Sequence, residues 1–253
     1  MKVQGIAAIV TGGGSGLGAA TGRALAAAGA KVALLDLNEE AARAVAQETG
    51  GLGLACDVAD ARSAEAAIAR AAAAHGPARI LVNCAGIVSG ARIVGRSGPA
   101  DLDAFAKVIQ VNLIGSFNLM RLVAAGALGL DPLEGGERGV VVSTASVAAY
   151  EGQIGQAAYA SSKAGIVGLT LPAAREFAPA GIRVCAIAPG LFETPMMQGL
   201  PREVQDSLGA AVPFPPRLGR PEEYARLVLA IIDNPMLNGE VIRLDGALRM
   251  QAR

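Results

Sequence analysis

The sequence predicts an α/β fold, a doubly wound domain in which a seven-stranded parallel sheet carries helices on both faces. Strand-like and helix-like segments alternate along all 253 residues, a pattern typical of parallel sheets with helical crossovers. No linker or low-complexity segment divides the chain, so we expect one domain over residues 1–253. Hydrophobic residues make up 52% of the sequence, which suits strands that are buried on both faces.

Seven short apolar segments are expected to form the sheet. The first, residues 6–10, reads IAAIV, and the second, residues 31–36, reads KVALLD. Short apolar segments of this length, bounded by turn residues, indicate buried strands. The expected strands are 6–10, 31–36, 52–56, 78–83, 138–144, 182–187 and 240–244.

Longer segments of apolar and small residues separate these strands and predict helices. Pro172 lies inside the fifth helix and should kink it or free one carbonyl group. Apolar residues occur on several faces of helices 102–128 and 157–178, so one face should pack on the sheet and another on a partner subunit. The expected helices are 16–28, 39–48, 62–75, 102–128, 157–178 and 221–233.

Residues 190–220 follow the sixth expected strand and are rich in Pro, Met, Phe and Leu. Ligands of open α/β sheets bind beyond the carboxyl ends of the strands, so we expect a substrate lid here. A plain surface excursion with two short helices is the alternative. The apolar residues that could line a substrate cleft are Leu191, Phe192, Met196, Met197, Leu200 and Phe214.

A glycine-rich segment, TGGGSGLG at 11–18, lies between the first expected strand and the first expected helix. Its spacing is T-G-x-x-x-G-x-G, with glycines at 12, 16 and 18 and leucine at 17. A flexible turn would also be rich in glycine. In this setting, however, glycines let the backbone approach a pyrophosphate at the N-terminus of the helix.

Asp36 ends the second expected strand, eighteen residues after Gly18. An acid at this place binds the adenosine ribose hydroxyls of a dinucleotide. Gly13, Gly14 and Leu37 offer no cation for a 2′-phosphate. The sequence therefore predicts NAD as the hydride carrier, and NADP less well.

Tyr159 and Lys163 are one helical turn apart and share a helix face, with Ser146 thirteen residues before the tyrosine. A phenol ionises near pH ~10, and an adjacent ammonium favours its charged form. Lowering the pKa by about three units takes about 4 kcal/mol. We expect Tyr159 to transfer a proton near neutral pH while Ser146 holds the reacting oxygen, which suits alcohol oxidation or ketone reduction. A lone Y-x-x-x-K pair is more often a surface pair, and it is the accompanying motifs that favour catalysis.

Together these segments resemble the short-chain dehydrogenase/reductase family, over essentially the whole chain. The resemblance implies a Rossmann fold, NAD binding, and a catalytic tetrad of Asn112, Ser146, Tyr159 and Lys163, in which Asn112 holds a water that links Lys163 to solvent. Lys163 is also implied to bind the nicotinamide ribose. The implied cofactor-binding residues are Gly12, Ser15, Gly16, Leu17, Gly18, Asp36, Asp57, Val58, Asn83, Ala85, Gly86, Tyr159, Lys163, Pro189, Gly190 and Thr194.

The second half of the chain is similar to the type II 3-hydroxyacyl-CoA dehydrogenases, a subfamily also known for hydroxysteroid dehydrogenase activity. Four segments carry this likeness, and they start with the sequences STASVAAYEGQIGQAAYASSK, APGLFETP, VPFPPRLGRPEEYA and NPMLNGEVIRLDG. The likeness implies reversible, NAD-dependent oxidation of short- or medium-chain 3-hydroxyacyl-CoA, with possible branching of the acyl chain, and a homotetramer. Residues 87–101 diverge from the animal members; Arg92 and Arg96 there could meet CoA phosphates or be plain solvated charges.

Two other functions stay open at this point. One is an NADPH-dependent 3-oxoacyl reductase of the same family that acts on acyl-carrier-protein thioesters. The other, from a different class, is a non-catalytic scaffold subunit, because animal relatives of this subfamily serve in a tRNA-processing complex. The missing cation beside Asp36 disfavours the first, and the complete tetrad disfavours the second.

Composition excludes several function classes. The formal net charge is zero and no basic stripe occurs, so nucleic acid is not expected as a main partner. One histidine is too few for a histidine-built zinc site, so no metal is expected, and the three cysteines should be buried, reduced residues. We expect no membrane span, because polar residues, Gly or Pro interrupt each apolar run. No targeting segment is recognisable, so a cytoplasmic location is expected.

Overall fold

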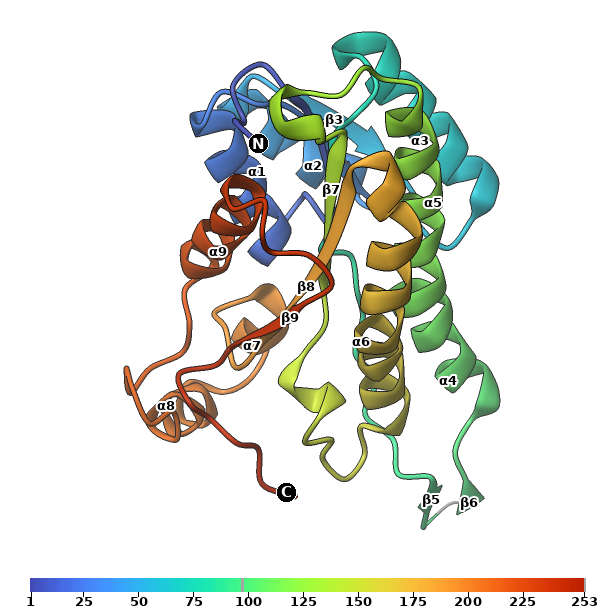
Figure 1. Ribbon diagram of the computed structural model, residues 1–253. Helices are drawn as coiled ribbons and strands as arrows, with labels where there is room; N and C mark the ends of the chain where they lie inside the picture. The colour runs from blue at the N-terminus through green and yellow to red at the C-terminus, as the bar shows by residue number, and fades with distance from the viewer. Residues whose placement is uncertain (97, 253) are drawn as a thin grey trace.

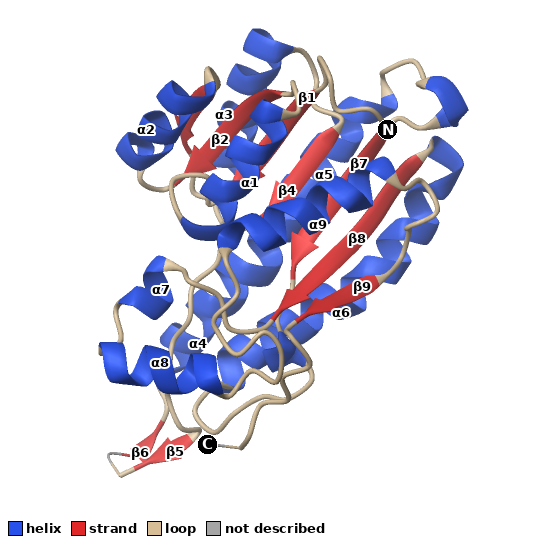
Figure 2. Ribbon diagram, turned by 90° about the vertical axis from the view of Figure 1, so that its left-hand side faces the viewer, coloured by secondary structure: helices blue, strands red, loops and turns tan. Residues whose placement is uncertain are grey.

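The computed structural model describes residues 1–96 and 98–252. Seven parallel strands form one sheet in the order β3-β2-β1-β4-β7-β8-β9 (Figure 2). The doubly wound α/β prediction is confirmed, and the strand ends lie within two residues of the predicted ones. The strands are β1 (Ala7–Thr11), β2 (Lys31–Asp36), β3 (Leu52–Ala55), β4 (Ile80–Asn83), β7 (Gly139–Thr144), β8 (Ile182–Pro189) and β9 (Val241–Leu244).

Helices cover both faces of the sheet (Figure 1). One face carries α1 (Gly16–Ala27), α2 (Glu39–Thr49) and α9 (Pro221–Asp233). The other carries α3 (Ala61–His75), α5 (Gly115–Leu128) and α6 (Ala157–Phe177).

The two cores on either side of the sheet follow from the alternation of side chains along each strand. In β1, Ala8 and Val10 pack toward α1, α2 and α9, whereas Ala7 and Ile9 pack toward α3, α5 and α6. Every residue of β1, β4, β7 and β8 is buried. This explains why the strands are predominantly apolar in sequence.

The predicted helix 102–128 is a continuous run of three parts. It comprises α4 (Leu102–Ile109), a π-helical turn (Gln110–Ile114) and α5. By length and composition alone this run would suffice to cross a membrane, but half of its most apolar window is buried inside the fold. Pro172 lies inside α6, which continues through it to Phe177.

The segments that surround the carboxyl ends of the strands lie together at one end of the molecule (Figures 1 and 2). A small hairpin, not predicted, pairs β5 (Val94–Gly95) with β6 (Gly98–Pro99). The predicted lid contains α7 (Pro195–Gln198) and α8 (Arg202–Ala210), and its two ends are joined by hydrogen bonds between residues 191–193 and Gly219. The side chain of Met196 lies outside the described part of the chain.

The order of the strands creates a crevice between β1 and β4. The chain leaves β1 toward β2 on one side and leaves β4 toward β7 on the other, so the connections diverge above the carboxyl ends of these two neighbours. Ligands of doubly wound sheets bind at such a switch point.

Candidate active site

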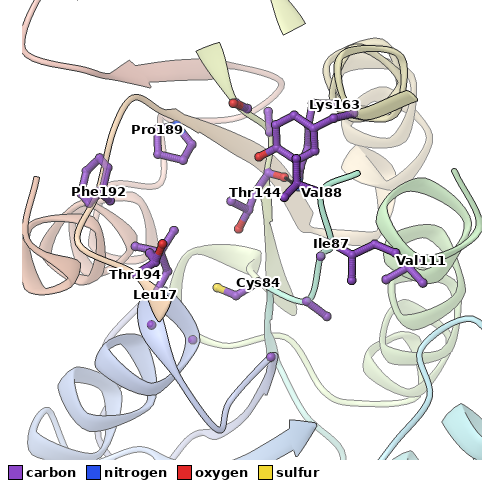
Figure 3. Close-up of a pocket in the computed structure, with 18 of the residues that line it drawn as sticks. Leu17, Cys84, Ile87, Val88, Val111, Thr144, Lys163, Pro189, Phe192 and Thr194 are labelled. Carbon is purple, nitrogen blue, oxygen red and sulfur yellow. Dashed lines mark hydrogen bonds between the residues drawn. The ribbon is translucent and has the colours of Figure 1, made fainter. Parts of the chain in front are cut away.

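A cavity of about 580 Å³ opens at this crevice, at the carboxyl ends of β1, β4, β7 and β8. Leu17 and Thr194 lie on one side of it, and Ile87 and Val111 on the other (Figure 3). The predicted site residues that line this cavity are Gly12, Ser15, Gly16, Leu17, Gly18, Asp36, Asp57, Val58, Ala85, Gly86, Ser146, Tyr159, Lys163, Pro189, Gly190 and Thr194.

The glycines of the loop before α1 are required by close backbone contacts. A Cβ atom on Gly18 would collide with the carbonyl oxygen of Gly12, and one on Gly12, whose φ is +62°, would lie 2.9 Å from the amide nitrogen of Ala85. The loop therefore presents bare backbone at the N-terminus of α1, where amide groups and the helix dipole favour an anion. This cradle fits the pyrophosphate of a dinucleotide.

Asp36 is held in place at the end of β2. Its two carboxylate oxygens accept hydrogen bonds from the backbone amides of Gly14 and Asn38, at 3.0 and 2.9 Å. A carboxylate fixed in this way suits a diol, such as the ribose hydroxyls, and repels an added phosphate.

Ser146, Tyr159 and Lys163 converge on the other end of the cavity. Ser146 lies two residues after β7 and caps the short 3-10 helix Val147–Ala149, where its hydroxyl accepts a hydrogen bond from the amide of Ala148 at 3.1 Å. Tyr159 and Lys163 project from the first two turns of α6, and the ammonium nitrogen lies 5.7 Å from the centre of the tyrosine ring. The structure thus assembles the groups predicted to handle the reacting oxygen.

Burial controls the acidities of this pair. It raises the pKa of Tyr159, and a hydrogen bond with Ser146 partly opposes that rise. It also lowers the pKa of Lys163 to about 8. The sequence predicts that the ammonium lowers the pKa of the phenol; in the folded protein, removal of water raises the pKa of Tyr159 instead.

The two predicted asparagines lie behind the wall of the cavity. Asn112 is fully buried in the π-helical turn; its amide group bonds both backbone groups of Ile87 and donates to the hydroxyl of Ser162 at 2.9 Å. Its backbone carbonyl accepts from Ser116. Asn83 donates to the Ser116 carbonyl and the Ser143 hydroxyl. Both amides therefore support the strand ends and α6 from behind.

Two threonines, Thr11 and Thr144, hold the strand ends together. They stand beside the sequence motifs and were not predicted as site residues. The Thr11 hydroxyl accepts from the amides of Cys84 and Ala85, both at 3.1 Å, and so joins β1 to the chain leaving β4. Thr144 donates to the carbonyl of Asn83 at 2.6 Å and shares a hydrogen bond with Tyr224. The location of each threonine at the end of a buried strand is the signal that could have found it.

The lid contributes only part of its predicted apolar lining. Leu191, Phe192 and Met197 line the cavity. Leu200 and Phe214 are exposed, the latter by 79%, so their prediction as lining is wrong. The reason for Phe214 is that its backbone amide pairs with the carbonyl of Gly246, which sets this stretch of the lid outside the cavity.

The predicted arginines and cysteines lie in different surroundings. Arg92 and Arg96 are exposed on and beside the β5–β6 hairpin and do not line the cavity. Cys56 and Cys185 are buried, as expected, whereas Cys84 is half-buried; Cys56 and Cys84 both border the cavity. Among residues 1–96 and 98–252 no group of His, Cys, Asp or Glu is arranged to hold a metal ion.

Residues 6–205 match the model of a protein family described as short chain dehydrogenase. The chain belongs to this family. Short-chain dehydrogenases are oxidoreductases, and the cradle and the Ser-Tyr-Lys group described above occupy one cavity of an enzyme of this kind.

Similar proteins are known for the whole length of this short-chain dehydrogenase. It is 51% identical to a human protein named 3-hydroxyacyl-CoA dehydrogenase type-2, over 99% of this chain and 97% of that protein. The protein of the same name from Drosophila melanogaster is 48% identical, over 98% of this chain and 99% of the other. The crystal structure of a 3-hydroxyacyl-CoA dehydrogenase type-2 from Mycobacterium avium superposes with a TM-score of 0.93, at 45% identity and 98% coverage of both chains.

Proposed function

We propose that this short-chain dehydrogenase oxidises short- or medium-chain 3-hydroxyacyl-CoA thioesters to 3-oxoacyl-CoA with NAD, reversibly. The observation that carries the proposal is the joining of the glycine cradle and Asp36 to Ser146, Tyr159 and Lys163 in a single cavity. Relatives that are about half identical carry the name 3-hydroxyacyl-CoA dehydrogenase, and the matched region covers nearly the whole chain, which supports the thioester substrate.

The catalytic group transfers one proton and directs one hydride. The Tyr159 oxygen, as phenolate, accepts the proton of the substrate hydroxyl, while the hydrogen on C3 leaves with its electron pair. Bound NAD supplies the acceptor for that hydride. Ser146 donates a hydrogen bond to the substrate oxygen as its carbon becomes a carbonyl, and Lys163 stabilises the phenolate. In the reductive direction Tyr159 returns the proton to the oxygen.

The preference for NAD over NADP follows from Asp36. Gly14 and Asn38 already orient its carboxylate toward the cavity. A 2′-phosphate would place a second negative charge against it, and a like charge at this distance disfavours binding by several kcal/mol. A reductase that works with NADPH would need a cation here.

The acyl chain is proposed to lie against the apolar side chains of the lid. Leu191, Phe192 and Met197 offer a flexible apolar lining for an alkyl group. An adaptable cleft selects weakly by shape, so hydroxysteroids are proposed as poorer substrates.

A panel of substrates tests the function. We expect kcat/KM with NADH to be highest for acetoacetyl-CoA, compared with a free ketone, a steroid ketone and the matching acyl-carrier-protein thioester. A preference of more than tenfold for the carrier-protein thioester would replace this proposal with the reductase. A protein that binds NADH but turns over none of the panel would instead favour the scaffold.

A further inference from the structure

The C-terminal segment Leu248–Ala252 returns to the catalytic cavity, which neither motif nor family match marks as a site. Leu248 is buried, and Met250, half-buried, lines the cavity together with Gln153 and Gln156. These two glutamines lie between Ser146 and Tyr159 along the chain. The tail therefore adds an apolar side chain to the part of the cavity that holds the catalytic residues.

Glu151 anchors this tail. Its carboxylate accepts a hydrogen bond from the backbone amide of Met250 at 3.1 Å and two from the guanidinium of Arg243, at 2.8 and 3.1 Å. Arg243 also pairs with Asp245 and donates to the carbonyl of Leu248. The carboxylate thus holds both the edge strand β9 and the tail that follows it.

Several further contacts reinforce this anchor. Arg243 packs its guanidinium over the ring of Tyr150, 5.2 Å from the ring centre. Arg249 pairs with Asp245 at 3.0 Å. Both arginines lower the pKa of Glu151, so the carboxylate is charged at neutral pH.

A second connection joins the tail to the loop before α6. The side-chain amide of Gln153 donates to the carbonyl of Gln251 at 3.1 Å, and the backbone amide of Ile154 donates to the carbonyl of Ala252 at 3.0 Å. Hydrogen bonds to the backbone of Met250, Gln251 and Ala252 hold the main chain of the tail in place. The flexible thioether side chain of Met250 can still adapt its conformation to a ligand. A freely moving tail would make none of these bonds.

We propose that Met250 is a specificity-determining residue that limits the length of the substrate chain, and that Glu151 is the positioning residue that holds it in the wall. The chemical class of the chain, an acyl thioester, rests on the proposed function. The size limit itself applies to any ketone or secondary alcohol that reaches Ser146 and Tyr159. Arg243 supports this position from outside the cavity, and Gln153 supports it from the cavity wall.

Truncation of the wall residue tests the proposal. With NADH, the ratio of kcat/KM for a ten-carbon over a four-carbon 3-oxoacyl-CoA should rise about tenfold in Met250→Ala, because room for even one more methylene in an apolar pocket changes discrimination by about tenfold or more. The KM for NADH should stay within about twofold of the wild type, since cofactor binding lies elsewhere. Met236→Ala is the matched control, at a side chain that is 90% exposed, and should leave the ratio unchanged.

Glu151 is tested by the same ratio. Glu151→Ala should shift it in the same direction as Met250→Ala, and Glu151→Gln, which keeps an acceptor for the amide of Met250, should shift it less. Glu48→Gln breaks a comparable Glu–Arg pair at an exposed, remote place and serves as its control. Equal loss of activity on both chain lengths in Glu151→Ala would indicate a merely structural role and overturn the positioning assignment.

A parallel series of 2-alkanones separates this inference from the proposed function. If the wild type reduces alkanones but no CoA thioester, the thioester assignment is refuted. The effect of Met250→Ala on the ratio of kcat/KM for long over short alkanones then decides the role of Met250. An unchanged ratio in Met250→Ala, in whichever series reacts, overturns the inference. A folded, NADH-binding wild type that reduces neither series overturns both.

Discussion

The ammonium group of Lys163 donates a 2.7 Å hydrogen bond to the backbone carbonyl oxygen of Thr144, in a side chain that is only 4% exposed. This bond joins the first turns of α6 to the end of β7 and fixes the lysine beneath Tyr159. It provides one partner for a charge that burial otherwise penalises. The fold therefore keeps a destabilised cation at the centre of the site, and the proposed chemistry needs that cation.

Replacing this lysine should stabilise the protein. The pKa of Lys163 falls from its usual 10.5 to about 8 on folding, which corresponds to about 3 kcal/mol against the charged form at neutral pH. Lys163→Met loses the bond to Thr144, so we expect a net gain of about 1–2 kcal/mol in the free energy of unfolding at pH 7, measured by urea titration.

The pH dependence of that gain identifies its cause. The unfolded chain binds the proton of Lys163 more tightly than the folded protein does. The contribution of Lys163 to the stability of the wild type should therefore rise as the pH rises from about 8 to 10.5. The advantage of Lys163→Met should accordingly shrink over the same interval. Lys107→Met, at an exposed lysine, is the control. A variant less stable than the wild type at pH 7 would show that the Thr144 bond outweighs burial.

Removal of the tyrosine hydroxyl should abolish turnover and leave the nucleotide in place. Tyr159→Phe deletes the proton-transfer group, which typically contributes a factor of about 10²–10⁴, but not the glycine loop or Asp36. We expect kcat to fall at least that far while the Kd for NADH, followed by fluorescence, changes less than about twofold. Substantial activity in this variant would exclude Tyr159 as the acid and base.

Asp36 should set the choice of coenzyme. In the unmodified protein we expect kcat/KM with NAD to exceed that with NADP by at least about a hundredfold, since a like charge disfavours the phosphate by several kcal/mol. Asp36→Ala should narrow this ratio by lowering the value for NAD and raising that for NADP. Equal efficiency of the wild type with both coenzymes would contradict the role given to this carboxylate.

The exposed apolar faces of α4, α5 and α6 predict a homotetramer. Phe105, Phe117 and Leu171 are 38%, 50% and 44% exposed, and apolar side chains of this size on neighbouring helices are typical of subunit interfaces. Light scattering at micromolar concentration should give four times the mass of the chain. Phe117→Asp should dissociate the assembly, whereas Met236→Asp, at another exposed apolar residue, should not. A monomeric wild type would refute the prediction.

The sequence by itself determined the order of strands and helices and most of the cavity wall. The reason is local: apolar runs of strand length are buried on both faces, a glycine loop is needed where backbones touch, and residues at the carboxyl ends of parallel strands meet at one edge. Gly12 and Ser146 follow strands and Asp36 ends one, so their meeting could be predicted without coordinates.

Only the tertiary structure decided what lies behind and beside that wall. Asn112 turns away from the cavity because the π-helical turn aims its amide at Ile87 and Ser162, and Phe214 faces solvent because its backbone pairs with Gly246. Met250 reaches the cavity through contacts with residues about a hundred positions earlier in the chain. Packing also set the acidity of Lys163. Such long-range pairings, and the exclusion of water they cause, have no periodicity or spacing from which a sequence could predict them.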